Sequence, residues 1–478
     1  MKLSGEIALA SGFIFDYSNM INTDTITPAV IETLESKAKD AADALLLIRE
    51  QGMAKAHLSK DGTPEHVFFT KLPFVKNGNP NTPESIAKLK QFGSYLQQEI
   101  DAVVFLGVGG SYLGNKVLFD IFAGSGWNVG CEKSRHGYPR VYFSGNNLDV
   151  DQYSEVVDEV EYLATHRLGK NEQFRVLLVP ISKSGTTLAA FSYFYEQCQK
   201  SSLLQMEVAV VTDLDEDISP LYNLAKENVW QCFDIKEGIG GRFCIFSDPG
   251  LITAAAIGMD IDAFLCGARD MENACQSASL GENPALLNAV LKYAAAEKGV
   301  DIEVFMPYAA KMKSVGEWYV QLLAESLGKR KDREGNVVYY GRTPVSAVGS
   351  TDMHAQTQQH QDGKKDKVIQ FVEILEREQQ IVLNNPFTHI SSLKKYDGLS
   401  VDHALKIALA ANEEALNSDG RLNAKYILPR IDEYYLGQLL YFLMLSVAYE
   451  GELADVDAYD QPGVETYKQI MKQKMSHQ

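Results

Sequence analysis

Residues 174–200 read FRVLLVPISKSGTTLAAFSYFYEQCQK, and this stretch decides the fold class. The run Val176–Ile181 is apolar and rich in β-branched residues, which predicts a strand buried on both faces of a sheet. From Thr187 to Gln199, apolar residues recur at helical spacing without Pro or Gly, which predicts a helix. A strand, a short turn and a helix in this order are one step of a parallel α/β sheet.

The turn between this strand and this helix is rich in hydroxyl groups. It consists of Ser182, Lys183, Ser184, Gly185 and Thr186. A helix start offers free backbone N–H groups and the positive end of the helix dipole, and the hydroxyls and the ammonium group add further donors. The turn therefore predicts a site for an anion such as phosphate. An ordinary Ser/Thr helix cap explains the same residues, and this turn alone does not decide between the two.

A second turn of this kind lies upstream. The strand Ala102–Leu106 is followed by GVGGSYLG at 107–114 and by a helix through Phe122. Glycines let the backbone approach a ligand closely at a helix start. A dinucleotide site would need Gly-x-Gly-x-x-Gly. Tyr112 occupies the position of the third glycine, and no acidic residue closes the unit about 20 residues on, which disfavours nicotinamide binding.

Further strands are expected at 140–144 and 208–212, with a charged helix between the first of these and residue 174. Alternating strands and helices with short turns predict a doubly wound parallel sheet. Ligands bind at the carboxyl ends of the strands in such sheets. Ser111, Asn146 and Ser182 all follow the end of a predicted strand.

The segment 238–250 reads GIGGRFCIFSDPG and holds Arg242 between a glycine pair and aromatic residues. An arginine fixed in this way can direct its planar donors at an anion or at a developing oxyanion. A glycine-rich hinge with a solvated arginine is the alternative interpretation.

A second α/β half is expected from about residue 300. It contains predicted strands at 302–306, 337–340, 345–348 and 368–374, and a helix at 311–328. Glu325 lies in the last turn of that helix and is a candidate general base. An exposed glutamate on a helix surface is the alternative, because most glutamates are exposed.

Two polar residues downstream, His354 and Lys468, are further candidates. Residues 349–363 are Gln-rich, carry His354 and are expected to form a solvated loop, although histidine can move protons near neutral pH. Pro462 fits the first turn of a last helix. Lys468 follows one turn into that helix, where it could face a ligand or only water.

The composition excludes several functional classes. A net charge of −18 and a pI of about 5.0 argue against binding to nucleic acid or to an anionic membrane surface. The six cysteines form no Cys-x-x-Cys pair, which predicts free thiols in a reducing compartment. No His spacing typical of a metal site occurs. The N-terminus lacks a signal peptide and Leu436–Tyr449 is too short to span a bilayer, so we expect a cytoplasmic protein.

Six motifs occur in a diagnostic order: GVGGSYLG at 107–114, SKSGTT at 182–187, GGRF at 240–243, QLLAESLGK at 321–329, STDMHAQ at 350–356 and DQPGVETYK at 460–468. This order resembles the glucose-6-phosphate isomerase (phosphoglucose isomerase) family, in its shorter bacterial type. The resemblance runs from about Ala102 to the C-terminus. Asp248–Pro249, where small apolar residues are usual, is a mild departure.

The resemblance implies an α/β fold of two sugar-isomerase (SIS) domains, each a parallel five-stranded sheet flanked by helices. It places a small, phosphate-binding SIS domain at 95–255 and a large one with the C-terminal helices at 256–478. Residues 1–94 would form an N-terminal helical segment that packs on the large domain.

The resemblance also implies a reaction and its residues. The reaction is the reversible isomerisation of D-glucose 6-phosphate to D-fructose 6-phosphate, by ring opening and proton transfer through a cis-enediolate. The implied catalytic residues are Glu325, His354, Lys468 and Arg242. The implied substrate-binding residues are Gly110, Ser111, Ser182, Lys183, Ser184, Thr187 and Gln461. No metal or organic cofactor is implied, and His354 would reach the partner's site in a homodimer.

Three alternatives stay open at this point. A non-catalytic sugar-phosphate sensor could keep the hydroxyl turn, although it would not need the catalytic set. The set present here argues against a sensor: Glu325, His354, Arg242 and Lys468. An isomerase of another sugar phosphate, such as mannose 6-phosphate, would carry the same motifs. An NAD-linked oxidoreductase is disfavoured by Tyr112.

Overall fold

The computed structural model describes residues 4–22, 25–59, 61–185 and 188–476. The chain divides into two compact units. The large unit comprises residues 1–65 and 266–478, and the small unit comprises residues 66–265. The domain boundaries expected after residues 94 and 255 remain predictions.

The small unit is built around a five-stranded parallel sheet, as expected for its fold class. Its strands are β5 (Ala102–Gly107), β6 (Arg140–Ser144), β7 (Phe174–Ile181), β8 (Leu204–Thr212) and β9 (Gln231–Asp234), in the order β6-β5-β7-β8-β9. The apolar run in β7 is buried from Val176 to Ile181, because helices cover both faces of the sheet. The strand predicted from this run is therefore confirmed.

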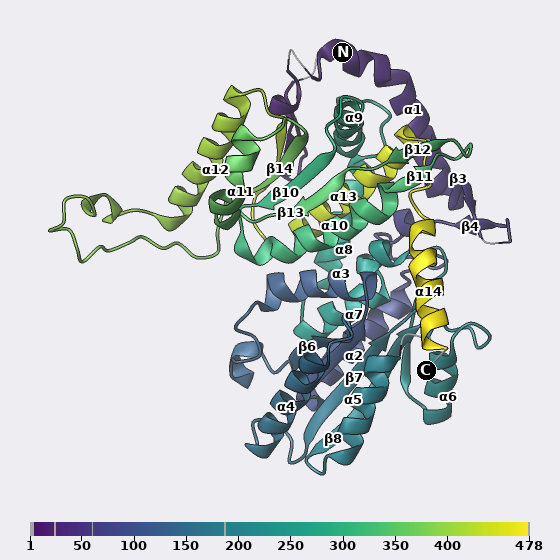
Figure 1. The fold of residues 1–478 in the computed structure, drawn as a ribbon. Coiled ribbons are helices and arrows are strands. Elements are labelled where there is room, and N and C mark those ends of the chain that lie inside the picture. Colours follow the sequence, from purple (N-terminus) through teal and green to yellow (C-terminus); the bar gives the residue numbers. More distant parts are fainter. Residues whose placement is uncertain (1–3, 23–24, 60, 186–187, 477–478) are drawn as a thin grey trace. The chain divides into compact units, whose positions relative to one another are not determined.

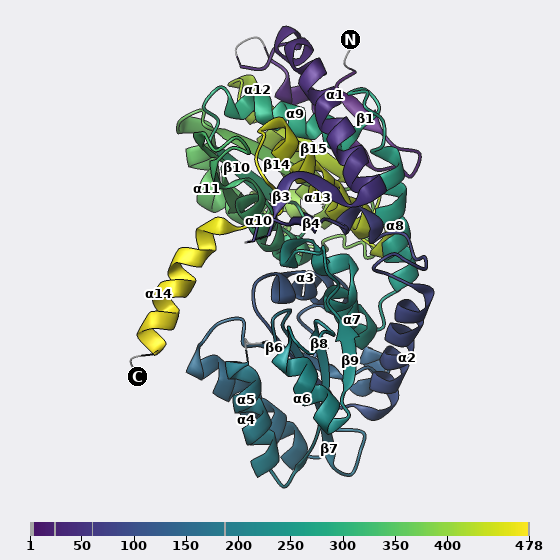
Figure 2. The ribbon, with the colours of Figure 1, turned by 90° about the vertical axis from the view of Figure 1, so that its right-hand side faces the viewer.

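The helices of the small unit are α2 (Pro83–Glu99), α3 (Gly110–Leu118), α4 (Val150–Thr165), α5 (Ala189–Lys200), α6 (Pro220–Asn228) and α7 (Asp248–Ile257). Figure 2 shows α4 and α5 on the left of this sheet and α2 on its right. Phe191 and Phe194 of α5 pack with Tyr153 of α4 against the sheet. Leu188 has a non-helical backbone, so α5 begins at Ala189.

The large unit contains a six-stranded mixed sheet. Its strands are β1 (Glu6–Ala8), β2 (Ile14–Asp16), β10 (Ile302–Pro307), β13 (Thr343–Ser346), β14 (Lys367–Ile374) and β15 (Asn423–Leu428), in the order β1-β2-β15-β14-β10-β13. Four strands are parallel, whereas β2 runs antiparallel to β15 and β1 antiparallel to β2. Five parallel strands were expected here. The difference arises because N-terminal residues cover the edge of β15, with Phe15 buried beside Tyr426 and Phe442.

The helices of the large unit are α1 (Pro28–Gln51), α9 (Pro284–Ala296), α10 (Lys313–Leu327), α11 (Thr351–Asp362), α12 (Val401–Ser418), α13 (Glu433–Leu453) and α14 (Glu465–Met475), and α8 (Ile261–Ala274) spans the unit boundary. Two short ribbons pair β3 (Met53–Leu58) with β4 (Pro64–His66) and β11 (Lys329–Lys331) with β12 (Val337–Tyr340). Figure 1 shows α11 and α12 on one side of the six-stranded sheet and α9 and α13 on the other.

The expectation of a solvated loop at 349–363 is wrong, because residues 351–362 form α11. No Gly or Pro interrupts this segment, and Gln, Ala and Met favour helices. At its start the Asp352 carboxylate accepts a hydrogen bond of 2.6 Å from the Val348 N–H. Polar composition here marks an exposed helix rather than a loop.

The most apolar helix, α13, is buried along nearly its whole length within the large unit. No helix in the described ranges is long and apolar enough to cross a membrane.

The two units share one strand order. In the small unit the first parallel strand, β5, lies between the second, β6, and the third, β7. In the large unit β10 lies in the same way between the second parallel strand, β13, and the third, β14. A fourth strand, β8 or β15, follows beyond the third. Each sheet therefore has a switch point, between β5 and β7 or between β10 and β14, where successive crossovers leave in opposite directions.

Candidate active site

The glycine-rich turn after β5 and the hydroxyl-rich turn after β7 lie at the switch point of the small unit. β5 and β7 are neighbours and run in parallel, with Gly107 paired to Ile181 at their carboxyl ends. The turns before Ser111 and Ser182 therefore start at the same edge of the sheet. Parallel α/β sheets bind ligands in the crevice outside the carboxyl ends of such strands. The structure thus brings Ser111 and Ser182 into one region, and their binding roles stay predictions.

The glycine turn before α3 is pressed against the loop that carries Arg242. Gly109 has φ = 58° at the helix start, a backbone angle that glycine adopts without strain. A Cβ atom on Gly110 would lie 2.1 Å from the Gly241 carbonyl oxygen. Only a glycine at position 110 allows this contact, so the turn and the 3-10 helix Gly241–Phe246 are fixed together.

The backbone of the second turn is anchored to β8. The Ser182 N–H donates to the Val211 carbonyl at 3.0 Å, and the Thr212 hydroxyl donates to the Ser182 carbonyl at 2.7 Å. Gly185 has φ = 62°, and a side chain there would meet the Ser219 hydroxyl. Lys183 and Ser184 remain exposed on this anchored turn. The predicted ligand Thr187 lies outside the described residues.

Arg242 is buried, with only 1% of its surface exposed. Its guanidinium lies 5.4 Å from the centre of the Phe243 ring. The interpretation of this segment as a hinge with a solvated arginine is therefore wrong. A buried guanidinium held by a packed loop is fixed in direction, which suits the stabilisation of negative charge.

The departure from the family pattern at Asp248 has a structural role. Asp248 is the first residue of α7, and its carboxylate accepts a 3.0 Å hydrogen bond from the Asp234 N–H. Burial raises the pKa of Asp248 to about 6. The residue thus joins α7 to β9 next to the Arg242 loop.

Glu325 is partly buried near the end of α10, with polar partners on both sides in sequence. The Gln321 side chain donates to the Glu325 carboxylate at 2.8 Å, and the Lys329 ammonium donates to the Glu325 carbonyl at 3.0 Å. Sequence reasoning missed both residues. For Gln321 the signal was the spacing of four residues, which places its side chain and that of Glu325 on one helix face. Lys329 has the same spacing on the other side, but it follows the end of the helix.

The other predicted residues of the large unit are exposed. His354 lies on α11, and Gln461 precedes a 3-10 turn that begins with Pro462. Lys468 lies on α14, with its ammonium 3.6 Å from the Glu465 carboxylate. The structure links Glu325 to Asp460, the residue before Gln461, through the Lys329 ammonium. His354 lies on a separate helix.

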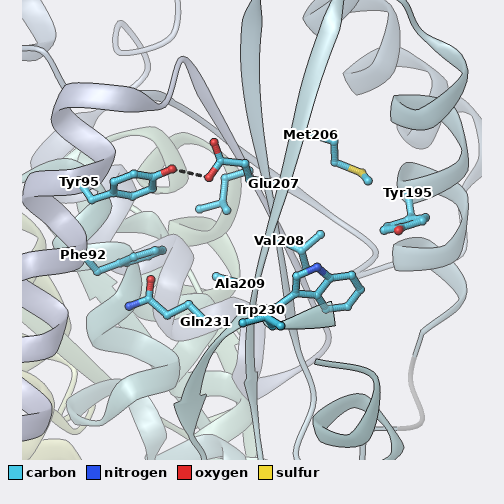
Figure 3. A pocket seen from close by; sticks show the side chains of 11 residues that line it. Phe92, Tyr95, Tyr195, Met206, Glu207, Val208, Ala209, Trp230 and Gln231 are labelled. Carbon is cyan, nitrogen blue, oxygen red and sulfur yellow. Dashed lines mark hydrogen bonds between the residues drawn. The ribbon is translucent and has the colours of Figure 1, made fainter. Parts of the chain in front are cut away.

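A cavity of about 500 Å³ in the small unit does not involve the predicted site. It surrounds the amino-terminal half of β8, with Phe92 and Tyr95 on one side and Tyr195 and Trp230 on the other (Figure 3). Its one carboxylate, Glu207, accepts a hydrogen bond from the Tyr95 hydroxyl. The described residues of the glycine-rich turn and of the hydroxyl-rich turn do not line this cavity, and it offers no cluster of donors for a phosphate.

The described residues contain no group of three or more His, Cys, Asp or Glu arranged to hold a metal ion. All six cysteines are free thiols, as predicted.

Together these features define an α/β protein with a parallel sheet and a mainly parallel sheet of shared topology, and with a hydroxyl-rich turn at a switch point. A sequence profile of the phosphoglucose isomerase family matches residues 84–478, and the chain belongs to this family. It is 33% identical over 403 residues to the glucose-6-phosphate isomerase of Carboxydothermus hydrogenoformans, covering 84% of this chain and 83% of that one. It is 32% identical to that of Methanocaldococcus jannaschii, covering 81% and 86%.

Solved structures share the fold. A hypothetical protein from Thermus thermophilus superimposes with a TM-score of 0.77 at 27% identity, over 94% of this chain and 97% of that one. A glucose-6-phosphate isomerase from Chlamydia trachomatis gives a TM-score of 0.79 at 21% identity, over 99% and 90%.

Proposed function

We propose that this protein interconverts D-glucose 6-phosphate and D-fructose 6-phosphate, as an aldose–ketose isomerase. The observation that carries the proposal is the family match over residues 84–478, which includes all six motifs. The reaction opens the sugar ring and moves a proton between C2 and C1 through a cis-enediolate. It needs a base of suitable strength and a group that holds the enediolate charge.

We assign the two parallel sheets to two SIS-type domains. Their shared strand order, with a switch point in each, supports a common origin for the two halves. The antiparallel strands β1 and β2 are then an addition to the edge of the second domain.

The hydroxyl-rich turn of the small unit is the proposed phosphate site. Lys183 and Ser184 present exposed donors on a backbone that β8 anchors, and Ser182 is part of the same turn. Ser111 and the Gly110 backbone lie at the adjacent strand end. A phosphate held there serves positioning, and correct positioning of a substrate lowers reaction barriers by several kcal/mol.

Removal of the Ser184 hydroxyl is expected to weaken substrate binding. In Ser184→Ala, the KM for fructose 6-phosphate should rise about 10-fold with little change in kcat, because one hydrogen bond to a charged group is lost. Steady-state kinetics measure both constants. Ser192→Ala, an exposed serine on α5, is the matched control and should leave KM unchanged. An unchanged KM in Ser184→Ala contradicts the assigned phosphate site.

The chemical steps are assigned to four residues. Glu325 transfers the proton between C2 and C1, and its partner Gln321 fixes the carboxylate from one turn away. Arg242 holds the charge on the enediolate oxygens, a role that suits a buried and directed cation. His354 and Lys468 exchange protons with the ring oxygen and the C1 hydroxyl. Gln461 contacts the substrate beside them.

The protein is proposed to act in the cytoplasm as a homodimer, without a metal or an organic cofactor. His354 is exposed on α11 in the single chain, which leaves it accessible to a partner's site.

A coupled assay tests the proposed function. Purified protein receives fructose 6-phosphate without any cofactor, and glucose 6-phosphate is detected by a glucose-6-phosphate dehydrogenase with its nucleotide. We expect nucleotide reduction that depends on this protein. Failure to form glucose 6-phosphate, or faster conversion of mannose 6-phosphate in a parallel reaction, counts against the proposal.

A further inference from the structure

Lys329 is a buried lysine that joins two distant segments of the large unit. It is the first residue of β11, separated from α10 only by Gly328, and its side chain is 5% exposed. Its ammonium donates to the Glu325 carbonyl at 3.0 Å, to the Asp460 carbonyl at 2.6 Å and to the Asp460 carboxylate at 2.6 Å. An ammonium group has three protons, and the described contacts give this one three acceptors.

Two of the three acceptors are backbone carbonyls, so the contact is more than an ion pair. The Glu325 carbonyl is among the last four of α10, which have no partner within the helix. A cation there also faces the negative end of the helix dipole. Burying an ammonium costs several kcal/mol unless it is fully bonded. The arrangement therefore fixes the end of α10 to Asp460 in one geometry.

Asp460 is an anchored residue that precedes an exposed segment. Residues that precede it in the sequence are also held by side-chain contacts. Glu452 bonds Arg333 at 2.6 Å, and Asp457 bonds His57 at 2.9 Å. After Asp460, the stretch 461–463 and α14 contain no buried residue. Lys329 thus holds the residue from which the exposed segment leaves the large unit.

We propose that Lys329 is a positioning residue for the isomerase reaction, holding the Glu325 end of α10 in register with the segment that presents Gln461 and Lys468. This inference rests on the proposed function for its kinetic consequence. The proton-transferring carboxylate and the ring-opening ammonium act on neighbouring atoms of one sugar. Their separation must therefore be fixed, and a shift of about 1 Å can lower the rate about 100-fold.

The test compares Lys329→Met with a matched control. Met keeps the length of the side chain and removes all three donors. We expect kcat for fructose 6-phosphate to fall about 100-fold, with KM within about 3-fold of wild type, because the phosphate contacts are untouched. Lys329→Arg retains the charge and several donors, and should recover at least about 10-fold of the lost kcat.

Lys425→Met controls for lost stability. Lys425 is also mostly buried, with an ion pair of 2.8 Å to Glu413, but it lies on β15 and bonds no predicted site residue. This variant should lose stability and keep kcat. Assays are run below the unfolding temperature of each variant. A kcat within about 3-fold of wild type in Lys329→Met overturns the inference, as does an equal loss in Lys425→Met.

Hydrogen exchange gives a readout that does not depend on activity. Lys329→Met should speed amide exchange about 10-fold at 324–328 and 460–464, because both ends of the link are released, while α12 exchange stays unchanged. If the wild-type protein fails to isomerise fructose 6-phosphate, the proposed function fails, and exchange still tests the link. Unchanged exchange at both segments shows that Lys329 does not hold them together.

Discussion

Glu325→Gln is expected to lower kcat for fructose 6-phosphate by about 1,000-fold, because general-base catalysis typically contributes 10²–10⁴-fold to a proton transfer. The amide cannot accept the C2 proton, yet it keeps the size of the carboxylate and can still pair with Gln321. KM should therefore stay close to the wild-type value. Steady-state kinetics in both directions separate the two constants.

Glu317→Gln is the matched control for this variant. Glu317 lies two turns earlier on α10 and is exposed, with only a 3.8 Å pair to Lys313. Its kcat should equal that of the wild type. Near-normal turnover in Glu325→Gln would refute the assignment of the base, whatever the control does.

The largest effect on stability is expected at Arg342, in the core of the large unit. Its guanidinium donates to Glu303 at 2.9 Å and to Glu450 at 2.7 Å, and Lys292 bonds Glu303 from the other side at 2.5 Å. All four side chains are at most 1% exposed. Arg342→Met leaves two buried carboxylates facing one ammonium, which should lower the free energy of unfolding by about 3–5 kcal/mol.

This loss should depend on pH. Burial alone would raise the pKa of Glu303, but Lys292 and Arg342 outweigh it and lower the pKa to about 2. A lowered carboxyl pKa stabilises the folded state above the ordinary value of 4.5, and this contribution disappears as the pH falls through 2. The difference in the free energy of unfolding between Arg342→Met and the wild type should therefore become smaller as the pH falls from 4.5 to 2.

Urea unfolding, monitored by hydrogen exchange of the β10 amides, measures this loss of stability in the large unit. Lys200→Met removes an exposed pair with Glu196, in which both side chains are at least 60% exposed. This control should change stability by less than about 1 kcal/mol. An Arg342→Met loss as small as that of the control contradicts the account of the buried network.

The apolar patterns of the sequence predicted the elements whose conformation depends on neighbouring residues in the chain. The apolar run of β7 is long and continuous, so strand, turn and helix could be read from it directly. β1 and β2 could not, because each has three residues and owes its conformation to pairing with β15. α11 was not predicted because its residues are mostly polar and show no apolar residues at helical spacing.

In the candidate site, too, some features could be predicted from the sequence, and others depend on contacts between residues far apart in the chain. The strand ends of Ser111 and Ser182 followed from the sequence, since a parallel sheet brings its carboxyl ends to one edge. The burial of Arg242 did not, because the contact of Gly241 with Gly110 joins segments 131 positions apart. The two contacts of Lys329 differ in the same respect. Its spacing of four residues from Glu325 is visible in the sequence, whereas its contact with Asp460, also 131 positions away, is not.

We propose that this chain itself converts one sugar phosphate into the other through Glu325. Nuclear magnetic resonance of glucose 6-phosphate labelled with carbon-13 at C1 tests it without coupling enzymes. Wild-type protein should convert the aldose C1 signal into the ketose C1 signal and reach the same ratio from fructose 6-phosphate, whereas Glu325→Gln should leave each sugar unchanged over the same time. No conversion by the wild type, or equal conversion by both proteins, would contradict the account.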